Sequence, residues 1–420
     1  MTTQNIADGV RFCSVKTDKF KTCRVNISLA MPLDKSASAR AILPFMFSRR
    51  CAKYPDFTSL NRVLDGLYGA SVSAGILKRG EAQILSFSMT AIDDRFALDG
   101  DKVAFECAQL LAEMIFDPLT EGKSFPEDII EQEKRLLVET IENEQNDKRR
   151  YAMLRCEQLM FADEAYGINR LGSVDEVKAL TPADVYSAWR DVLEKATVQI
   201  TMVSSMDPQP VAELIKDKFS EIERNPVEIK TQFVSGLPKP EYVCETMPLK
   251  QGKLVMGFRM GAPATEREKN AARVLSAMYG GTPFSKLFMN VREKLSLCYY
   301  VTSHFERGTG VMFVDCGIEF ESRDEAQSEI LRQLENIANG GITEEELAGT
   351  KLIIKNSLGS VEDSLSGIDN WYMTCVLDGL ILTPEEDAAE IDKITAEEVA
   401  AMAKRAKLSA VFFLEGGKAK

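Results

Sequence analysis

The chain contains an internal duplication. Residues 62–69, RVLDGLYG, return as residues 273–280, RVLSAMYG, 211 positions later. Residues 179–185, ALTPADV, return as residues 393–399, KITAEEV, after 214 positions. Matches in the same order at a nearly constant offset indicate two copies of one domain, because a solenoid needs several short repeats.

Each copy has the pattern of a mixed fold. Residues 83–92 alternate, with Leu85, Phe87 and Met89 on one side, as in a half-buried strand. The strand expected at 197–204 has a counterpart at 410–414. Strands and helices in mixed runs predict an α+β fold with two homologous domains, each a mostly antiparallel sheet packed with helices.

A stretch rich in proline separates the copies. Pro226, Pro238, Pro240 and Pro248 interrupt any regular pattern there, as is typical of a linker. We therefore expect an N-terminal domain at 1–225, a linker at 226–248 with an edge strand near its end, and a C-terminal domain at 249–420.

Composition limits the class of protein. A net charge of −13 with 45% hydrophobic residues is typical of a globular protein and disfavours a nucleic-acid partner. No apolar stretch is long enough for a membrane helix, and MTTQNIADGV has no signal-peptide pattern. The nine cysteines form no C-x-x-C pair, so we expect reduced thiols and a cytoplasmic protein.

The histidine count excludes one chemistry. His304 is the single histidine, whereas the usual zinc peptidase site needs two with a carboxylate. The strand-like sequence VTSHFE around it predicts a surface or satisfied histidine.

Residues 280–318 carry the strongest local signal. Arg292 lies near the end of a helix expected at 284–293, and Tyr299 follows seven residues later at the start of a strand. A guanidinium fork and a phenol are both hydrogen-bond donors, and together they can reach a peptide carbonyl from one side. A surface arginine beside a half-buried tyrosine is the plainer interpretation.

The duplication and this stretch together resemble the insulinase/pitrilysin-type peptidases, whose zinc motif is H-x-x-E-H. The segment VREKLSLCYYV resembles the family's R-E-K-x-G-L-x-Y-x-V, with Ser296 at the usual glycine. Three further segments support the match: IIEQEKRLLVETI, LGSVDEVKALTPADV and EEDAAEIDKITAEEV. The resemblance implies the fold of the short bacterial members and of the mitochondrial processing peptidase subunits.

The zinc motif itself is absent. The family's zinc helix corresponds to residues 36–50, and alignment on LPFMF places Ala41 and Phe45 at the two histidines and Pro44 at the glutamate. None of these side chains can bind zinc or accept a proton.

The third zinc ligand of the family falls on Thr140, or on Glu139 if the alignment slips by one residue. The other glutamates of this segment, Glu131, Glu133, Glu142 and Glu144, have the spacing of a mostly solvated helix face. The resemblance therefore implies a degenerate member that holds no metal of its own.

In this family the Arg and Tyr of the second-half motif act at a zinc site carried by another half or chain. The resemblance carries that role over to Arg292 and Tyr299 as substrate-binding groups. It implies a non-catalytic subunit of a heterodimeric zinc peptidase, with zinc in a homologous partner and a peptide as substrate. A homodimer of the lone chain stays open.

Two other functions stay open. The chain could be a structural or peptide-binding protein with no role in proteolysis. It could also be a hydrolase that uses Cys298, although His304 lies five or six residues along the same strand, where it is poorly placed as a base.

Overall fold

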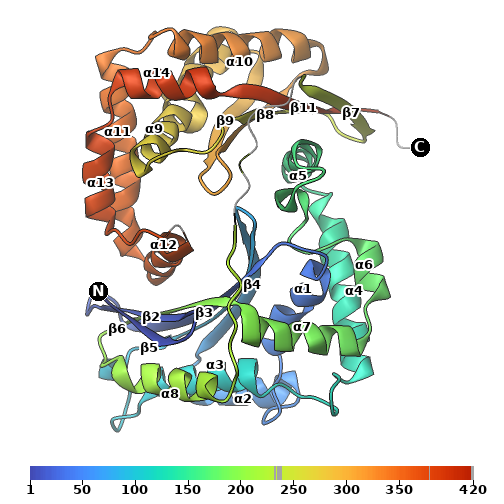
Figure 1. The fold of residues 1–420 in the computed structure, drawn as a ribbon, viewed down its shortest axis with the longest axis vertical. Coiled ribbons are helices and arrows are strands. Elements are labelled where there is room, and N and C mark those ends of the chain that lie inside the picture. Colours follow the sequence, from blue (N-terminus) through green and yellow to red (C-terminus); the bar gives the residue numbers. More distant parts are fainter. Residues whose placement is uncertain (231–232, 234–238, 378, 418–420) are drawn as a thin grey trace. The chain divides into compact units, whose positions relative to one another are not determined.

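The computed structural model describes residues 1–230, 233, 239–377 and 379–417. The chain forms two compact units (Figure 1). The first unit contains residues 1–142, 168–230 and 361–381, and the second contains residues 143–167, 231–360 and 382–420. Each unit is built on one β-sheet.

The two sheets have equivalent strand orders. The first sheet runs β1 (Thr2–Ala7), β2 (Val10–Lys16), β6 (Thr197–Ser204), β3 (Thr22–Pro32), β5 (Ala82–Ile92) and β4 (Ser71–Arg79). The second sheet runs β7 (Glu241–Met247), β11 (Lys407–Gly416), β8 (Gly252–Arg259), β10 (Val311–Ile318) and β9 (Cys298–Glu306). Once β1 is set aside, the two sheets correspond strand by strand.

The strand directions agree as well. Each sheet has one parallel pair, β2 with β6 and β7 with β11, and its other pairs are antiparallel. This topology confirms the predicted α+β fold with mostly antiparallel sheets. Strand β7 is the edge strand expected near the end of the linker, although residues 231–232 and 234–238 of that linker lie outside the described residues.

Alternation along the strands places the core of the first unit. Val25, Ile27 and Leu29 of β3 are buried in one cluster with Leu85 and Phe87 of β5. The helices on this side are α1 (Ala37–Phe47), α2 (Phe57–Gly66), α3 (Val103–Phe116), α4 (Glu127–Glu144), α6 (Val174–Ala179), α7 (Pro182–Lys195) and α8 (Gln209–Ser220). These helices therefore pack against the apolar side of the sheet, as the sequence pattern predicts.

The second unit repeats this arrangement. Helices α9 (Glu266–Ser276), α10 (Arg323–Ala338), α11 (Glu344–Gly359), α13 (Pro384–Asp392) and α14 (Ala396–Arg405) accompany its sheet. Helices α7 and α14 begin with the same device, a capping box in which a threonine and an acidic residue three positions later satisfy each other's backbone donors. Thr181 pairs with Asp184, and Thr395 with Glu398, as the duplication predicts.

One helix of each half packs in the unit of the other half. Helix α5 (Lys148–Met160) belongs to the second unit, and its counterpart α12 (Leu365–Leu377) belongs to the first. In Figure 1, each lies on the side of its sheet opposite to the other helices of that unit. The helical pattern of the sequence from Ile129 to Ile141 predicts one long helix that continues toward Phe161. This prediction is wrong, because α4 ends at Glu144 and Asp147 caps the separate helix α5.

Specific contacts hold both exchanged helices. In the first unit, Arg24 Nε donates to Asp369 of α12 at 3.1 Å. In the second unit, Arg149 of α5 pairs with Asp315 of β10 at 2.5 Å. Met160 of α5 also lies so close to Gly257 of β8 that an added Cβ would sit 1.9 Å from its sulfur. The glycine is therefore required for this close approach.

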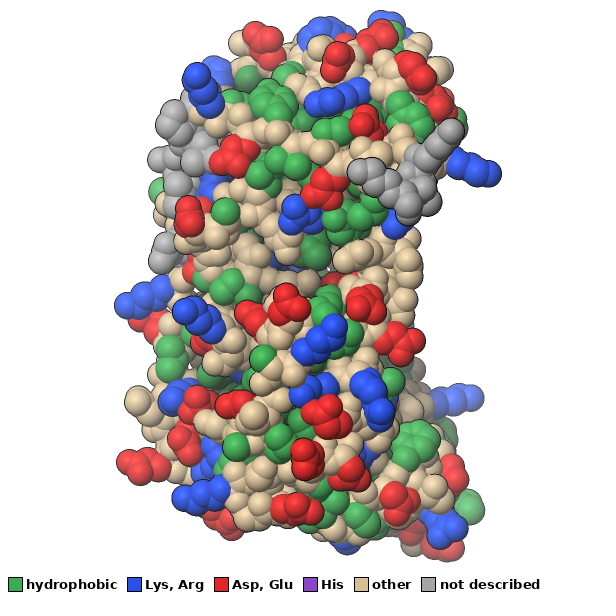
Figure 2. Space-filling model, turned by 90° about the vertical axis from the view of Figure 1, so that its right-hand side faces the viewer, with side chains coloured by type: hydrophobic (Ala, Val, Ile, Leu, Met, Phe, Trp, Pro, Cys, Tyr) green, Lys and Arg blue, Asp and Glu red, His purple; other side chains and the backbone are tan. Residues whose placement is uncertain are grey.

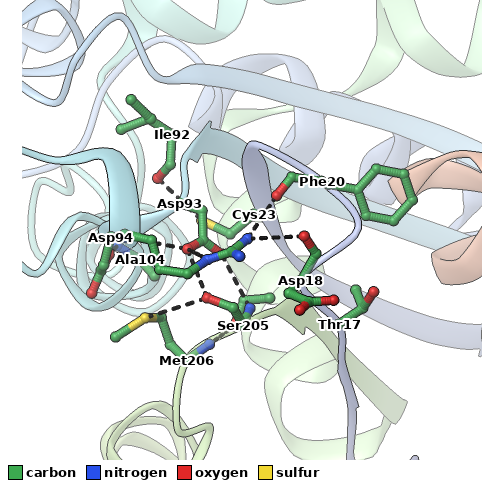
Figure 3. A network of polar contacts seen from close by, with 12 residues as sticks. Thr17, Asp18, Phe20, Cys23, Ile92, Asp93, Asp94, Ala104, Ser205 and Met206 are labelled. Atoms are coloured by element: carbon green, nitrogen blue, oxygen red, sulfur yellow. Dashed lines mark hydrogen bonds and ion pairs between the residues drawn. The ribbon is translucent and has the colours of Figure 1, made fainter.

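A buried carboxylate joins three segments of the first unit (Figure 3). Asp93 accepts hydrogen bonds from the backbone and the side chain of both Arg95 and Ser205. Arg95 in turn donates to the carbonyls of Asp18 and Phe20. The network fastens the ends of β5 and β6 to the turn before β3.

The surface carries charges of both signs. Figure 2 shows acidic and basic side chains interspersed over one face, without an extended area of one sign. Within the part of the chain that the structure describes, we find no helix whose length and apolar character would let it cross a membrane.

Candidate functional site

Two unusual helical segments lead into the predicted site, and the second contains Arg292. Segments η3 (Ala277–Gly281) and η4 (Phe288–Lys294) have π-helical hydrogen bonding, which is rare and often found at functional sites. The predicted helix at 284–293 is π-helical from Phe288. Leu287 and Val291 are fully buried, so they anchor η4 to the unit.

Tyr299 lies in a β-bulge at the start of β9. Tyr300 pairs with Gly317 and Cys298 pairs with Ile318, so Tyr299 has no partner in the ladder. Bulges redirect side chains and are common beside active sites. The Tyr299 side chain is 57% exposed.

Arg292 is on η4, which packs against β9. Its guanidinium carbon lies 4.7 Å from the centre of the Phe288 ring, and its Nε lies 3.7 Å from a Glu293 oxygen. The side chain is 43% exposed. Stacking on the ring orients the fork while it remains accessible to a ligand.

The phenol of Tyr299 donates a hydrogen bond to Glu319, which follows β10. This bond raises the pKa of Tyr299, so the phenol keeps its proton at neutral pH. The structure therefore places both predicted donors on the surface of adjacent elements of the second unit. Their role toward a peptide stays a prediction.

Ser296 preserves the turn between these two residues. Its φ is +55°, a left-handed conformation that glycine adopts without steric cost. The backbone N–H groups of Ser296 and Leu297 donate to the carbonyls of Arg292 and Val291 at 3.1 and 2.9 Å. Serine is therefore accommodated in this turn, which leads the chain into β9.

The cysteine alternative has little support from the geometry. Burial raises the pKa of Cys298 to about 11, so its thiol is protonated at neutral pH. His304 is exposed, with Nε2 3.9 Å from a Glu306 oxygen, as the sequence predicts for a surface histidine.

The former zinc positions offer no ligand atoms. Ala41 is fully buried in the core, Pro44 lies inside α1, and Phe45 packs against the same core. Thr140 donates its hydroxyl to the carbonyl of Leu136, one turn earlier in α4, at 2.8 Å. These residues do not fit a zinc ion, and the described residues contain no group of three or more His, Cys, Asp or Glu side chains suited to a metal.

Glu133 is the residue that the sequence interpretation missed. It was expected on a solvated face, but its side chain is fully buried. Arg49 and Arg50, directly after α1, lie 3.1 and 3.4 Å from its oxygens. Burial raises the pKa of Glu133, and the two arginines oppose that rise. Its seven-residue spacing from Thr140, two helical turns on the same face, was the available signal.

Comparisons with known proteins agree with these observations. Residues 179–354 match the family described as "Peptidase M16 inactive domain". The "Probable inactive metalloprotease YmfF" of Bacillus subtilis is 32% identical over 403 residues, which cover 96% of this chain and 95% of that protein. The chain belongs to the M16 peptidase family.

Other similar proteins match most or all of the chain. The "Uncharacterized zinc protease YmxG" of Bacillus subtilis is 22% identical over 91% of this chain and 94% of its own length. A conserved protein of Enterococcus faecalis, 29% identical, superposes with a TM-score of 0.89 over 100% of this chain and 99% of that one. An M16 inactive-domain protein of Pseudomonas fluorescens, 18% identical, gives 0.80 over 100% and 98%. The chain is an inactive M16 homologue.

Proposed function

We propose that this chain is the non-catalytic subunit of a heterodimeric M16 zinc peptidase. One observation carries the proposal: Arg292 and Tyr299 are exposed on two elements that pack together, η4 and β9, whereas the positions that align with the family's zinc site hold Ala41, Pro44, Phe45 and Thr140. The chain thus has two hydrogen-bond donors for a substrate, but it has no side chains at these positions that could bind zinc and activate water.

The two donors suit the chemistry of peptide hydrolysis. Attack on a peptide bond builds negative charge on its carbonyl oxygen, and preorganised donors aimed at that oxygen lower the barrier. Arg292 supplies a permanent charge, and Tyr299 supplies a hydroxyl donor that forms a hydrogen bond to Glu319 in the absence of a ligand. The partner's zinc would activate the water, and this chain would orient and polarise the peptide.

The partner in this proposal is a homologue with an intact H-x-x-E-H motif. One relative called a zinc protease, YmxG, aligns over 91% of this chain and 94% of its own length, so such a partner would have a similar length. A chain with this fold also occurs in a structure described as "Complex III2 from Candida albicans, Inz-5 bound", with a TM-score of 0.77 over 99% of this chain and 95% of that one at 16% identity.

The test uses the assembled pair. Affinity purification of the native protein should recover a homologue with H-x-x-E-H, and its absence would contradict the heterodimer. In the recovered pair, Arg292→Ala should lower kcat by about 100-fold or more without changing assembly, as removal of an oxyanion donor does. Arg332→Ala, which removes an exposed arginine of α10, is the matched control.

The structural or peptide-binding alternative predicts different results. In that case no zinc-motif homologue is recovered, and Arg292→Ala has no effect on any peptidase activity associated with the chain.

A further inference from the structure

The strands at the ends of the two sheets differ in how well they are protected. In the described parts of the chain these strands are β1, β4, β7 and β9. The outer backbone groups of such a strand can pair with another chain, and proteins usually prevent this with charges, prolines or bulges. Strand β4 ends in Lys78 and Arg79, β7 has two glutamates and lies between Pro240 and Pro248, and β9 has a bulge and ends in Glu306.

Strand β1 has neither a charged side chain nor a proline. Its sequence is TTQNIA, and its first four residues are exposed. Among the described residues it pairs with β2 alone, and an irregularity in that pairing falls between Asn5 and Ala7. The nearest acidic residue along the chain, Asp8, follows this irregularity. The outer edge of residues 2–5 is therefore open and carries no charge.

This edge is also preformed. Residues 2–5 pair in regular register with β2, and the hydroxyl oxygens of Thr2 and Ser14 lie 2.6 Å apart in a hydrogen bond. At the other end of the strand, Ile6 packs against the core of the first unit. Because the strand is already ordered, a second pairing along its outer edge would cost little conformational entropy.

The chemistry of the edge fits a second copy of the same chain. A two-fold axis through an antiparallel pair places the residues of β1 opposite the same strand of the other copy, and no like charges then face each other. Threonine favours strands, and the amides of Gln4 and Asn5 can donate to and accept from their own copies. The chain carries a net charge of −13, so two copies repel each other over most of their surface, and an uncharged strand avoids that repulsion.

We infer that two copies of this chain associate through their β1 strands, which pair antiparallel and join two six-stranded sheets into one sheet of twelve strands. The inference goes beyond the proposed function and does not depend on it. The paired segment is short, and it buries much less than the roughly 1,200 Å² of a stable interface. The dimer should therefore form only as the protein concentration rises.

Sedimentation velocity of the full chain tests the inference, over protein concentrations of about 1 to 100 µM. The wild type should shift from monomer toward dimer across this range. The double variant Gln4→Lys with Asn5→Lys should dimerise at least about tenfold more weakly, because like charges face each other across the axis. The double variant Gln4→Glu with Asn5→Glu should be weakened in the same way. An equimolar mixture of the two variants should dimerise again, since opposite charges then face each other.

Two control variants place a lysine on the other strands. Leu77→Lys alters β4, at the opposite end of the same sheet, and Tyr242→Lys alters β7 of the second sheet, both at exposed residues. Neither should change the dissociation constant of the dimer. Thermal unfolding of all variants should match that of the wild type, because the altered side chains are exposed.

Three results would overturn the inference. The first is a wild-type chain that stays monomeric at every concentration. The second is a dimer that survives both β1 variants, or that Leu77→Lys or Tyr242→Lys dissociates, because the contact then involves another strand. The third is a mixture of the lysine and glutamate variants that stays monomeric, because residues 4 and 5 then do not face their copies.

Discussion

Asp93 is buried at the end of β5, where a carboxylate is tolerated only if its oxygens are satisfied. Burial alone would raise the pKa of Asp93. The hydrogen bonds from Arg95 and Ser205 outweigh burial, so the pKa lies below its ordinary value. The charged carboxylate is thus more stable in the folded chain than in the unfolded one.

This shift predicts a pH-dependent contribution to stability. Asp93→Asn should lower the free energy of unfolding at pH 7 by about 2 kcal/mol, as expected for hydrogen bonds to a charged group. The contribution is complete above the unfolded pKa of about 3.9 and disappears as the pH falls through the lower folded value. Urea titrations from pH 7 to pH 3 should therefore show the gap between wild type and variant closing, and a constant gap would contradict the assignment.

At the scale of residues, the sequence predicted the missing zinc ligands better than it predicted the contacts of the residues that are present. One histidine and the residues Ala41, Pro44 and Phe45 were enough to exclude the usual zinc site. The burial of Glu133 could not be read in the same way, because it depends on Arg49 and Arg50 approaching from a segment 83 or 84 positions away. Likewise, the bond from Tyr299 to Glu319 depends on the pairing of β9 with β10.

At the scale of elements, the contact of α5 with β8 makes a testable prediction. Gly257→Ala places a methyl group against the Met160 sulfur and should cost about 1–3 kcal/mol of stability. In the double variant with Met160→Ala, part of this cost should vanish, giving a coupling energy of about 1 kcal/mol or more in a double-mutant cycle of unfolding free energies.

The control is another strand glycine. A Cβ added to Gly75 of β4 meets no atom within 4 Å, so Gly75→Ala should be close to neutral. Equal costs at Gly257 and Gly75 would show that loss of glycine flexibility, rather than the approach of α5, accounts for the effect.

Most elements were predictable from pattern alone. Local sequence is enough to predict the alternation of β5, the helix caps at Thr181 and Thr395, and the strand at residues 197–204. The π-helical form of η4 was not predictable, because π and α segments differ in hydrogen-bond register rather than in composition. The break after Glu144 was also missed, because charged residues continue on both sides of it.

At the scale of the whole molecule, the exchange of α5 and α12 predicts how the chain depends on both halves. Fragments 1–230 and 231–420 each lack one helix that their sheet needs. Expressed alone, neither should show cooperative unfolding, because an apolar side of its sheet is left uncovered, as around Val255 and Phe313. Expressed together, they should form a 1:1 complex, measurable by size-exclusion chromatography with light scattering.

Cleavage after folding provides the control. A protease site placed between residues 230 and 239 should be cut without separating the fragments until denaturant is added. A sharp thermal transition for either fragment alone would contradict the requirement for the exchanged helix.

The exchange of α5 and α12 also suggests why a chain without zinc ligands would keep both of its halves. A gene that lost the region encoding the first half would also lose helix α5. One side of the second sheet would then be exposed to solvent. The first half therefore stays necessary for the architecture of the second sheet, and substitutions that dislodge α5 should destabilise the chain even though the first half offers no zinc ligands.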